Sequence, residues 1–313
     1  VLTTPIVRAL KNCVKNVELH YLTKPENETL LKNNKYIDKL HLLKNDLSET
    51  TDELSKEEFG YVVDLQKNLR SLRIKKALGV RASSFPKLNI SKWLFVNLKL
   101  QCMPTIHIVD RYFEAVRDLE VVNDGKGLDY FLQEADFVDC ETLPAGFQSG
   151  YVACVVGSKH ATKQMPTDLM ADLCRKIQKP IILLGGKGDR DKAAIIGQQV
   201  GAKVFNACGN YNINQSAYLV KNALGIITPD TGLMHIAAAF DKNIVAVWGN
   251  TVPQFGMYPY RAANAKGKTY NFEVKNLHCR PCSKLGYAEC PKKHFRCMLG
   301  QDTDKIAEIA NAW

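Results

Sequence analysis

Residues 225–251 have the sequence GIITPDTGLMHIAAAFDKNIVAVWGNT. Two short apolar runs within it, Gly225–Thr228 and Ile244–Trp248, are rich in branched residues and predict buried strands. The Ala-rich run between them, Gly232–Phe240, predicts a helix. A strand, a helix and another strand in close succession are typical of a parallel sheet, because parallel strands need a crossover connection.

The same alternation extends through the rest of the second half of the chain. Apolar runs that end in Gly or polar residues alternate with segments of helical length. This order predicts a parallel sheet with helices on both faces. The predicted strands are Tyr151–Val156, Pro180–Leu184 and Val204–Asn206, and the predicted helices are Pro166–Ile177, Arg190–Val200, Asn214–Ala223 and Asp302–Trp313.

The first half of the chain has a weaker pattern of the same kind. An α/β domain normally begins with a strand, but no strand precedes the first predicted helix, which starts at Pro5. Asp124–Gly150 is rich in Gly, Asp and Pro and reads as a linker. We therefore place a boundary near Pro144, between an N-terminal domain (1–144) and a C-terminal domain (145–313). The elements predicted before it are strands Val17–Tyr21 and Tyr61–Leu65 and helices Pro5–Lys11, Thr29–Lys35, Asn68–Leu78 and Ile106–Val116.

The composition is that of an ordinary globular protein. Of 313 residues, 46% are hydrophobic and 24% are charged, and no apolar run is long enough to cross a bilayer. The formal charge of +10 suits an anionic partner, but Lys and Arg are dispersed and no nucleic-acid motif is visible. We expect no nucleic-acid partner. The positive charge can equally belong to a solvated surface without a functional role. No amphipathic segment stands out as a membrane anchor.

The ten cysteines fall into two groups. Six are scattered, several of them in apolar runs, and no signal peptide is visible, which favours a reducing, cytoplasmic environment. The other four have the spacing Cys-x2-Cys-x7-Cys-x6-Cys, which leaves zinc binding, free thiols and a disulfide open. We interpret the cluster as a structural feature and not as the active site. The scattered cysteines are Cys13, Cys102, Cys140, Cys154, Cys174 and Cys208, and the clustered ones are Cys279, Cys282, Cys290 and Cys297.

The junction between a predicted strand and a predicted helix around Asp230 is the strongest candidate for a ligand site. Ligands of open parallel sheets bind beyond the carboxyl ends of the strands. The free N–H groups of the first helical turn and the helix dipole would attract a diphosphate, and Gly232 would let it approach the backbone. The alternative, that Asp230 or Thr231 only caps the helix, stays open. Gly185–Asp189 reads as a tight turn, and His235 alone would read as a core histidine.

The residues around this junction resemble a family signature. Asp230–Ala239, followed by Trp248–Thr251, is similar to the signature of the heptosyltransferase family (glycosyltransferase family 9). Asp230–His235 is the specific part of the match, and the resemblance extends over essentially the whole chain. Further segments that resemble the family in order and spacing are Val1–Pro5, Asp64–Ser71, His107–Tyr112 and Val156–Pro166.

The resemblance implies an α/β fold of the GT-B architecture, in which two Rossmann-like domains with parallel sheets face a cleft. It implies an inverting transfer of heptose from an ADP-sugar donor to the lipid A–core region of lipopolysaccharide, with no metal ion and no cofactor. By motif, the catalytic residues would be Asp230, which contacts the donor sugar, and Lys163. The donor-binding residues would be Ser158, Lys159, Thr231, Gly232, Leu233, Met234 and His235. The acceptor-binding residues would be Gln66, Asn68, Arg70 and Arg111.

The general base is not assigned. In the family it is an Asp of a Gly-Asp pair that would stand just before Val1, and it is not in the sequence. The lipid-linked oligosaccharide acceptor is compatible with peripheral contact at the inner face of the inner membrane. Two other functions stay open: a nucleotide-sugar epimerase of the same fold, which would convert the donor alone, and a non-catalytic relative that binds carbohydrate or nucleic acid, the latter with a steep salt dependence.

Overall fold

The computed structural model describes residues 1–313, apart from the side chain of Cys140, and its largest feature is a six-stranded sheet in the C-terminal half (145–313). The strands are all parallel, in the order β10-β9-β8-β5-β6-β7. The order extends in both directions from β5, which is the doubly wound arrangement. The strands are β5 (Val152–Val155), β6 (Ile181–Leu184), β7 (Val204–Asn206), β8 (Gly225–Pro229), β9 (Asn243–Trp248) and β10 (Thr269–Glu273).

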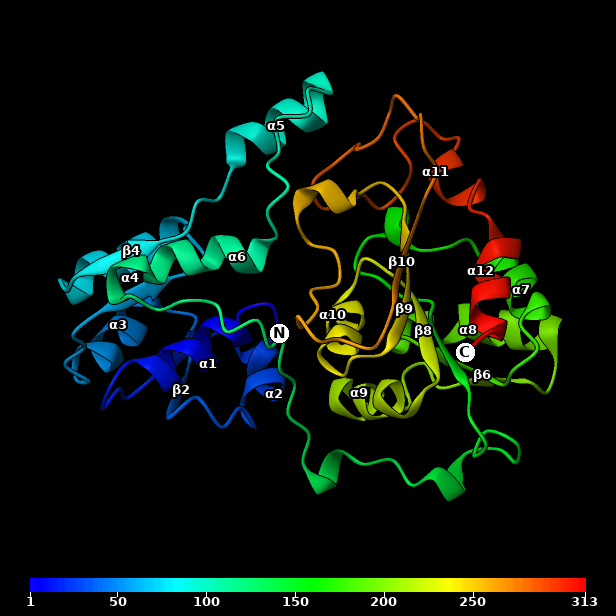
Figure 1. Ribbon diagram of the computed structural model, residues 1–313, viewed down its shortest axis with the longest axis horizontal. Helices are drawn as coiled ribbons and strands as arrows, with labels where there is room; N and C mark the ends of the chain where they lie inside the picture. Colours follow the sequence, from blue (N-terminus) through cyan, green and yellow to red (C-terminus); the bar gives the residue numbers. More distant parts are fainter.

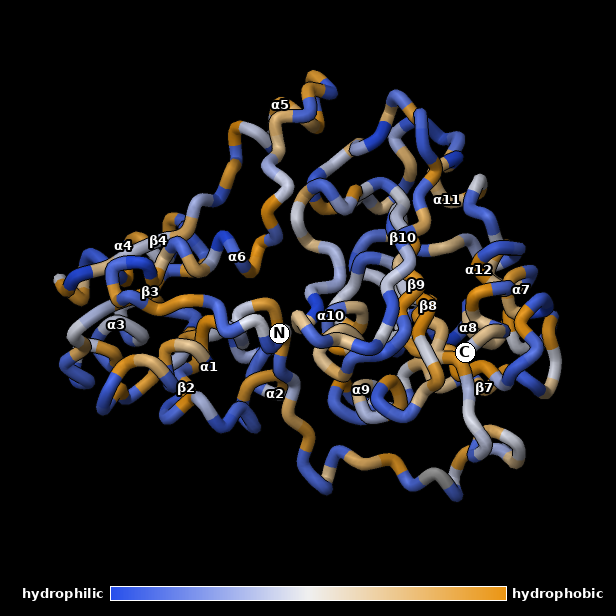
Figure 2. Tube along the Cα trace, viewed as in Figure 1, coloured by the Kyte–Doolittle hydropathy of each residue, from blue (hydrophilic) through white to orange (hydrophobic). Residues whose placement is uncertain are grey.

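Helices cover both faces of this sheet (Figure 1). Successive strand residues point to opposite faces, so Ala153 packs with α9 and α10, whereas Val152 and Cys154 pack with α7, α8 and α12. The hydrophobic colours of β8 and β9 in Figure 2 mark this buried layer. The helices are α7 (Thr167–Lys176), α8 (Arg190–Val200), α9 (Ile213–Asn222), α10 (Gly232–Ala239), α11 (Arg296–Leu299) and α12 (Thr303–Asn311).

The strands and helices that the sequence predicts for the C-terminal half are present, with small shifts at their ends. The predicted tight turn is also present, because the Gly186 N–H donates to Asp189 Oδ2 at 2.8 Å. The sequence does not predict β10. This strand pairs only with β9 at the edge of the sheet, and its residues are half-buried or exposed, so it lacks the apolar run that marks a central strand.

The N-terminal half (1–144) has parallel strands in two separate pairs. β1 pairs with β2, and β3 pairs with β4, and no ladder among the described residues joins the two pairs. Each strand has only three or four residues. The parallel direction agrees with the expectation, but the half contains two narrow sheets and not one continuous sheet. The strands are β1 (His20–Thr23), β2 (Lys39–Leu42), β3 (Val62–Asp64) and β4 (Ala82–Ser84).

The helices of the N-terminal half pack around these pairs, except for one. α5 protrudes from the body of the molecule, and none of its residues is buried (Figure 1). The segment predicted as one helix over Ile106–Val116 is α6 followed by the 3-10 helix Glu114–Leu119. No helix in the described part of the chain is both long and apolar enough to span a bilayer. The helices are α1 (Thr4–Cys13), α2 (Glu28–Leu31), α3 (Leu47–Ser55), α4 (Leu69–Leu78), α5 (Asn89–Leu98) and α6 (Ile108–Phe113).

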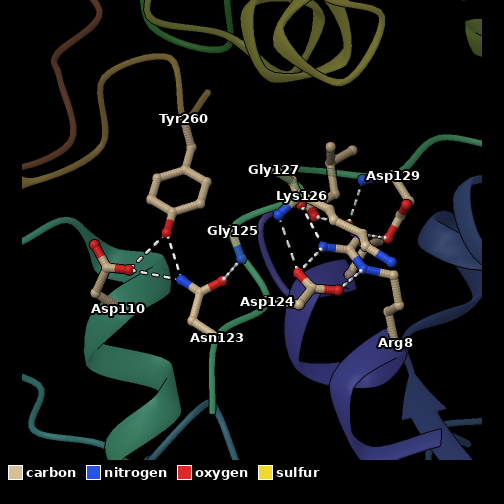
Figure 3. A network of polar contacts seen from close by, with 11 residues as sticks. Arg8, Asp110, Asn123, Asp124, Gly125, Lys126, Gly127, Asp129 and Tyr260 are labelled. Atoms are coloured by element: carbon tan, nitrogen blue, oxygen red, sulfur yellow. Dashed lines mark hydrogen bonds and ion pairs between the residues drawn. The ribbon is translucent and has the colours of Figure 1, made fainter. Parts of the chain in front are cut away.

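Hydrogen bonds around Tyr260 join the two halves (Figure 3). The Tyr260 hydroxyl donates to Asp110 Oδ1 of α6 at 2.6 Å, and the Asn123 amide donates to the same hydroxyl at 2.6 Å. Nearby, His107 Nε2 donates to the Tyr258 carbonyl at 2.8 Å. These contacts hold the start of α6 against the C-terminal half and so fix the side chains that α6 carries.

A buried arginine joins α1 to the segment that leads out of the N-terminal half (Figure 3). Arg8 Nε and Nη2 each donate to an oxygen of Asp124 at 2.8 Å, and Nη2 also donates to the Gly127 carbonyl at 2.9 Å. Nη1 forms a further ion pair with Asp129. With 3% of its side chain exposed, Arg8 is a buried charge that these partners compensate.

Candidate active site

An ion pair between Lys163 and Asp230 stands at the carboxyl edge of the C-terminal sheet. Lys163 Nζ lies 2.6 Å from Asp230 Oδ2, and the Thr251 hydroxyl donates to the same oxygen at 3.1 Å. Lys163 lies after β5, Asp230 after β8 and Thr251 after β9, so three neighbouring strands bring these side chains together. Only 14% of the Lys163 side chain and 13% of the Asp230 side chain are exposed, so water screens their attraction weakly.

Helix α10 begins beside this ion pair with an open N-terminus. Thr231 stands at the N-cap position, but its side chain makes no capping hydrogen bond, and its hydroxyl lies 3.0 Å from that of Thr228. A Cβ added to Gly232 would have no neighbour within 4 Å in the described structure. Neither Asp230 nor Thr231 therefore caps α10 through a side-chain hydrogen bond, and the first-turn N–H groups are open to an anion.

The next residues of α10 turn their side chains into the core. Leu233 and Met234 are buried, so they can offer a ligand only their backbone, as the motif predicts. His235 is buried too, and its Nδ1 has no hydrogen-bond partner among the described residues. Burial lowers the pKa of His235 to about 4, so this imidazole is neutral near pH 7.

Ser158 and Lys159 lie in the loop that follows β5. Ser158 is half-buried, and its carbonyl accepts a hydrogen bond from the Gln164 amide at 2.8 Å, whereas Lys159 is exposed. The loop also lies against the turn after β6, since a Cβ on Gly157 would come within 2.0 Å of Asp189 Oδ2. Glycine at this position therefore lets the loop reach the edge of the sheet, where Ser158 and Lys159 stay available to a ligand.

The cysteine-rich segment supports the loops on both sides of the ion pair. Arg280 Nε donates to the Gly249 carbonyl at 2.6 Å, and Arg280 Nη2 donates to the Thr251 carbonyl at 3.0 Å. On the other side, the Tyr287 N–H donates to Thr162 Oγ1 at 2.8 Å, next to Lys163. The segment therefore fixes the backbone that carries Thr251 and Lys163, which is a supporting role.

The clustered cysteines form no disulfide in the described structure. Cys279 Sγ lies 3.8 Å from His294 Nε2. Burial, with a smaller effect of the neighbouring thiols, raises the pKa of Cys282 to about 11 and that of Cys297 to about 12. Among the scattered cysteines, Cys154, Cys174 and Cys208 are buried, Cys13 and Cys102 are exposed, and the side chain of Cys140 lies outside the described residues.

The expected acceptor residues Gln66, Asn68 and Arg70 are exposed around the start of α4. Asn68 is also the N-cap of this helix, because its side chain accepts a hydrogen bond from the Ser71 N–H at 2.9 Å. No hydrogen bond in the described structure links these residues to Asp230 or Lys163. Two of them line a surface pocket of about 540 Å³, formed by Leu47, Asn68, Leu69, Arg70 and Arg73.

Arg111, the fourth expected acceptor residue, is buried beside other cations. Its Nη2 donates to the Phe255 carbonyl at 3.0 Å, whereas Nε and Nη1 have no partner among the described residues. Burial, with the positive charges of Arg111, Lys284 and Lys87, lowers the pKa of Lys92 in α5 to about 8. A buried guanidinium with unpaired nitrogens next to further cations is a candidate anion site.

The sequence of this chain also matches the model of a known protein family. The profile of glycosyltransferase family 9 (heptosyltransferase) matches residues 49–287, which include the ion pair and Thr251. The chain belongs to glycosyltransferase family 9. Solved structures of this family share its fold: a glycosyl transferase family 9 protein from Veillonella parvula is 18% identical, with a TM-score of 0.75 over 99% of this chain and 92% of the other. The expected α/β fold of the GT-B type is thereby confirmed.

Two further relatives carry heptosyltransferase names. The structure of ADP-heptose lps heptosyltransferase II of E. coli is 15% identical, with a TM-score of 0.72 over 99% of this chain and 93% of the other. Lipooligosaccharide heptosyltransferase 2 of Haemophilus influenzae is 42% identical over 50 residues, which are 16% of this chain and 14% of that protein. The matched segments span between 14% and 31% of the curated relatives' length.

Sequence reasoning missed three residues that the geometry brings to the site. Thr251 stands in the family signature, but only the structure shows its bond to Asp230. Lys92 lies in a segment for which the sequence offers no functional motif, and Arg280 lies within the cysteine cluster, which the sequence analysis interprets as a structural feature. The position of Arg280 between Cys279 and Cys282 indicates a rigid segment, but it does not indicate that this segment holds the loop with Thr251.

Proposed function

We propose that this chain transfers heptose from ADP-heptose to the core region of lipopolysaccharide, with inversion at the anomeric carbon and without a metal ion. The observation that carries the proposal is the Lys163–Asp230 ion pair beside the open N-terminus of α10. Family membership supports the class of reaction, and the ADP-heptose name of the E. coli neighbour supports the donor.

The donor diphosphate would bind at the N-terminus of α10. The N–H groups of residues 231–234 would contact its oxygens, and Lys163, Lys159 and the Ser158 hydroxyl would add positive charge and a hydrogen bond. When the bond between sugar and phosphate breaks, negative charge builds on the departing diphosphate, and these fixed groups stabilise it. The step needs no metal ion, because the helix and the lysines supply the positive charge.

Asp230 would contact the donor sugar and hold Lys163 at the same time. Lys163 and Thr251 both bind its Oδ2, which leaves Oδ1 to accept a hydrogen bond from a sugar hydroxyl. His235, a neutral imidazole in the donor motif, would border this site without adding charge.

The acceptor would bind on the side of the N-terminal half. Arg111 and Lys92 would receive an anionic group of the acceptor, because Arg111 has unpaired nitrogens and Lys92 lies in the same field of positive charge. Gln66, Asn68 and Arg70 would offer hydrogen bonds to sugar hydroxyls. We assign no general base within residues 1–313.

We further propose a division near Pro144 into an acceptor-binding domain (1–144) and a donor-binding domain (145–313). We also propose that the protein acts in the cytoplasm, at the inner face of the inner membrane. Helix α5 supports the membrane contact, although the sequence does not single it out. Its side chains Ile90, Trp93 and Leu98 are 78%, 57% and 54% exposed, and lysines flank them. Exposed apolar and basic side chains on one helix favour an anionic lipid surface.

Trp93→Glu tests this contact. It removes an exposed apolar side chain and adds a charge that anionic lipid repels, so co-sedimentation with vesicles of phosphatidylethanolamine and phosphatidylglycerol should fall roughly tenfold. Leu299→Glu, at an exposed position of α11, is the matched control and should bind as the wild type does. Equal losses in both variants, or none in either, would speak against α5 as the contact.

Thermal unfolding with ADP, UDP, GDP, CDP, AMP and ADP-heptose tests the donor. A ligand that binds only the folded chain, at 100 times its dissociation constant, adds about 2.7 kcal/mol to the free energy of unfolding. We expect ADP and ADP-heptose to raise the unfolding midpoint selectively. A shift with UDP alone would change the donor, and no shift with any nucleotide would favour the non-catalytic relative.

Product analysis by NMR separates transfer from epimerisation. We expect ADP-heptose to be consumed only when a lipopolysaccharide core acceptor is present, and the new glycosidic bond to have the opposite anomeric configuration to the donor. Conversion of ADP-heptose without acceptor would favour the epimerase, and retained configuration would refute inversion.

A further inference from the structure

Two histidines and a glutamate form a cluster in the N-terminal half, apart from the residues of the proposed active site. His20 is the first residue of β1, His41 lies in β2, and Glu57 follows α3. One ligand atom of each residue lies within 4.8 Å of the other two. His20 Nδ1 and His41 Nε2 are 3.0 Å apart, and Glu57 Oε2 lies 3.8 Å from His20 Nδ1.

The second nitrogen of each ring faces a carboxylate. His20 Nε2 lies 3.0 Å from Glu18 Oε1, and His41 Nδ1 lies 3.5 Å from Glu53 Oε1. A neutral imidazole has a single N–H, and a carboxylate partner holds that N–H on the nitrogen it faces. In that tautomer the two nitrogens that face each other, 3.0 Å apart, both carry lone pairs, whereas in the alternative tautomer one ring donates an N–H to the other. Lone pairs this close repel each other unless a proton or a metal ion lies between them.

Burial makes this repulsion costly. The side chains of His20 and His41 are only 8% and 3% exposed, and Phe59 packs edge-on against both rings. Water is therefore largely excluded from the space between the rings. Lys39 pairs with Oε1 of Glu57, so Oε2 is the oxygen turned towards His20.

We propose that His20, His41 and Glu57 bind a divalent transition-metal ion, and that zinc is the ion they fit best. Imidazole nitrogen and carboxylate oxygen are ligands that zinc takes in proteins. With zinc–nitrogen bonds of about 2.0 Å, tetrahedral geometry places two nitrogens roughly 3.3 Å apart. The observed separation of 3.0 Å needs only a small widening to reach that value.

The surroundings have the arrangement common to metal-bound histidines. A ligating imidazole usually donates its other N–H to a carboxylate, which fixes the ring and makes it a better ligand. Glu18 and Glu53 stand in these two places. The metal ion would fasten β1, β2 and the segment after α3, where β1 and β2 form a sheet of only two strands and ion pairs such as Lys39–Glu57 link β2 to that segment. This role is structural and does not depend on the proposed transfer reaction.

Zinc titration of the full chain by calorimetry tests the site, with Co²⁺ as a spectroscopic probe. The clustered cysteines can bind the same ions through sulfur, so the titration uses a Cys279→Ser/Cys282→Ser background. We expect one zinc ion per chain there and a Co²⁺ spectrum without a sulfur-to-metal charge-transfer band. Saturating zinc should raise the midpoint of thermal unfolding by roughly 5 °C.

Three variants in that background separate ligands from neighbours. His20→Gln should abolish zinc binding. Glu53→Gln removes no ligand and changes a half-exposed side chain, so it should fold normally and weaken zinc affinity 10–100-fold. Glu49→Gln, an exposed position on the same helix, should bind zinc as the background does. No zinc binding in the background, or unchanged affinity in both His20→Gln and Glu53→Gln, would overturn the proposal, and a shared proton would then hold the two rings together.

Discussion

The two halves of the molecule are stabilised by different kinds of contact. In the C-terminal half, six strands form one sheet, and β6 is fully buried between two helical layers. In the N-terminal half, the strands form two pairs, and the apolar cluster around α1 has four buried members in the described chain, namely Ile6, Ala9, Val116 and Val121. Buried polar networks such as that of Arg8 supplement this small cluster.

This difference has a consequence for mutation. An apolar sheet loses stability when its core side chains are truncated, but it tolerates the loss of a polar group at its edge. A region joined through buried ion pairs loses much more when one partner is removed, because the other charge stays buried and unpaired. The proposed donor residues lie at the edge of the sheet, so their substitution should affect chemistry and spare folding.

Asp230→Ala should give the largest effect of all on activity. The substitution removes the contact to the donor sugar and frees Lys163 from its position, so transfer should fall by about 100-fold or more. The variant should still fold, because Asp230 lies beyond the end of β8, and its thermal midpoint should fall only by the loss of the Lys163 ion pair. Steady-state kinetics and thermal unfolding are measured together.

Lys163→Ala adds a check on the same pair. It should weaken the affinity for ADP, whereas Lys266→Ala, at an exposed lysine elsewhere in this half, should not. Wild-type turnover of Asp230→Ala would refute its role, and equal ADP affinity of Lys163→Ala and the wild type would exclude contact with the diphosphate.

Arg8→Met should give the largest effect on stability. It leaves Asp124 and Asp129 without their buried partner, and breaking such a network costs about 3–5 kcal/mol of unfolding free energy. Hydrogen exchange should show protection lost first in α1 and the N-terminal strand pairs. Chemical denaturation measures the total.

The matched control is Arg81→Met. Arg81 forms an ion pair with Asp118 in the same half, but both side chains are more than half exposed, so its loss should cost less than about 1 kcal/mol. Equal costs for the two arginine variants would contradict the view that buried polar networks stabilise this half.

The same contrast explains what the sequence can predict. The C-terminal strands can be predicted from continuous apolar runs such as Ile181–Leu184. In contrast, β1 begins three residues after the start of the predicted strand Val17–Tyr21. A short, half-buried strand gives no strong alternation of apolar and polar residues, so its ends are hard to predict. Asp230 and Lys163 follow from a motif, and their contact is a property of neighbouring strand ends. Lys92 and the His20 cluster could not be predicted, because no motif links them to their partners and only the fold brings these side chains together.

Acid should loosen the contact between the two halves through His107, with a smaller effect than Arg8→Met. His107 Nδ1 accepts from the Val109 N–H at 3.1 Å, and Nε2 donates to the Tyr258 carbonyl, so the folded state needs the neutral ring. Burial lowers the pKa of His107 from 6.5 to about 4, and this outweighs the opposing effects of the Tyr258 hydrogen bond and Asp110. The ring is therefore protonated at higher pH in the unfolded chain than in the folded one.

The sign of the pH effect follows from these two pKa values. The contribution of His107 to stability is fully present above pH 6.5 and is lost as the pH falls towards 4, so acidification from pH 7.5 to 5 should cost on the order of 1–2 kcal/mol. Denaturation at a series of pH values measures the slope. His107→Gln should lower stability at neutral pH and flatten that slope, whereas His160→Gln, at a half-buried loop histidine, should leave it unchanged. An unchanged slope in His107→Gln would move the acid sensitivity to His235, a buried imidazole whose pKa burial also lowers, and thus from the junction of the halves into the C-terminal core.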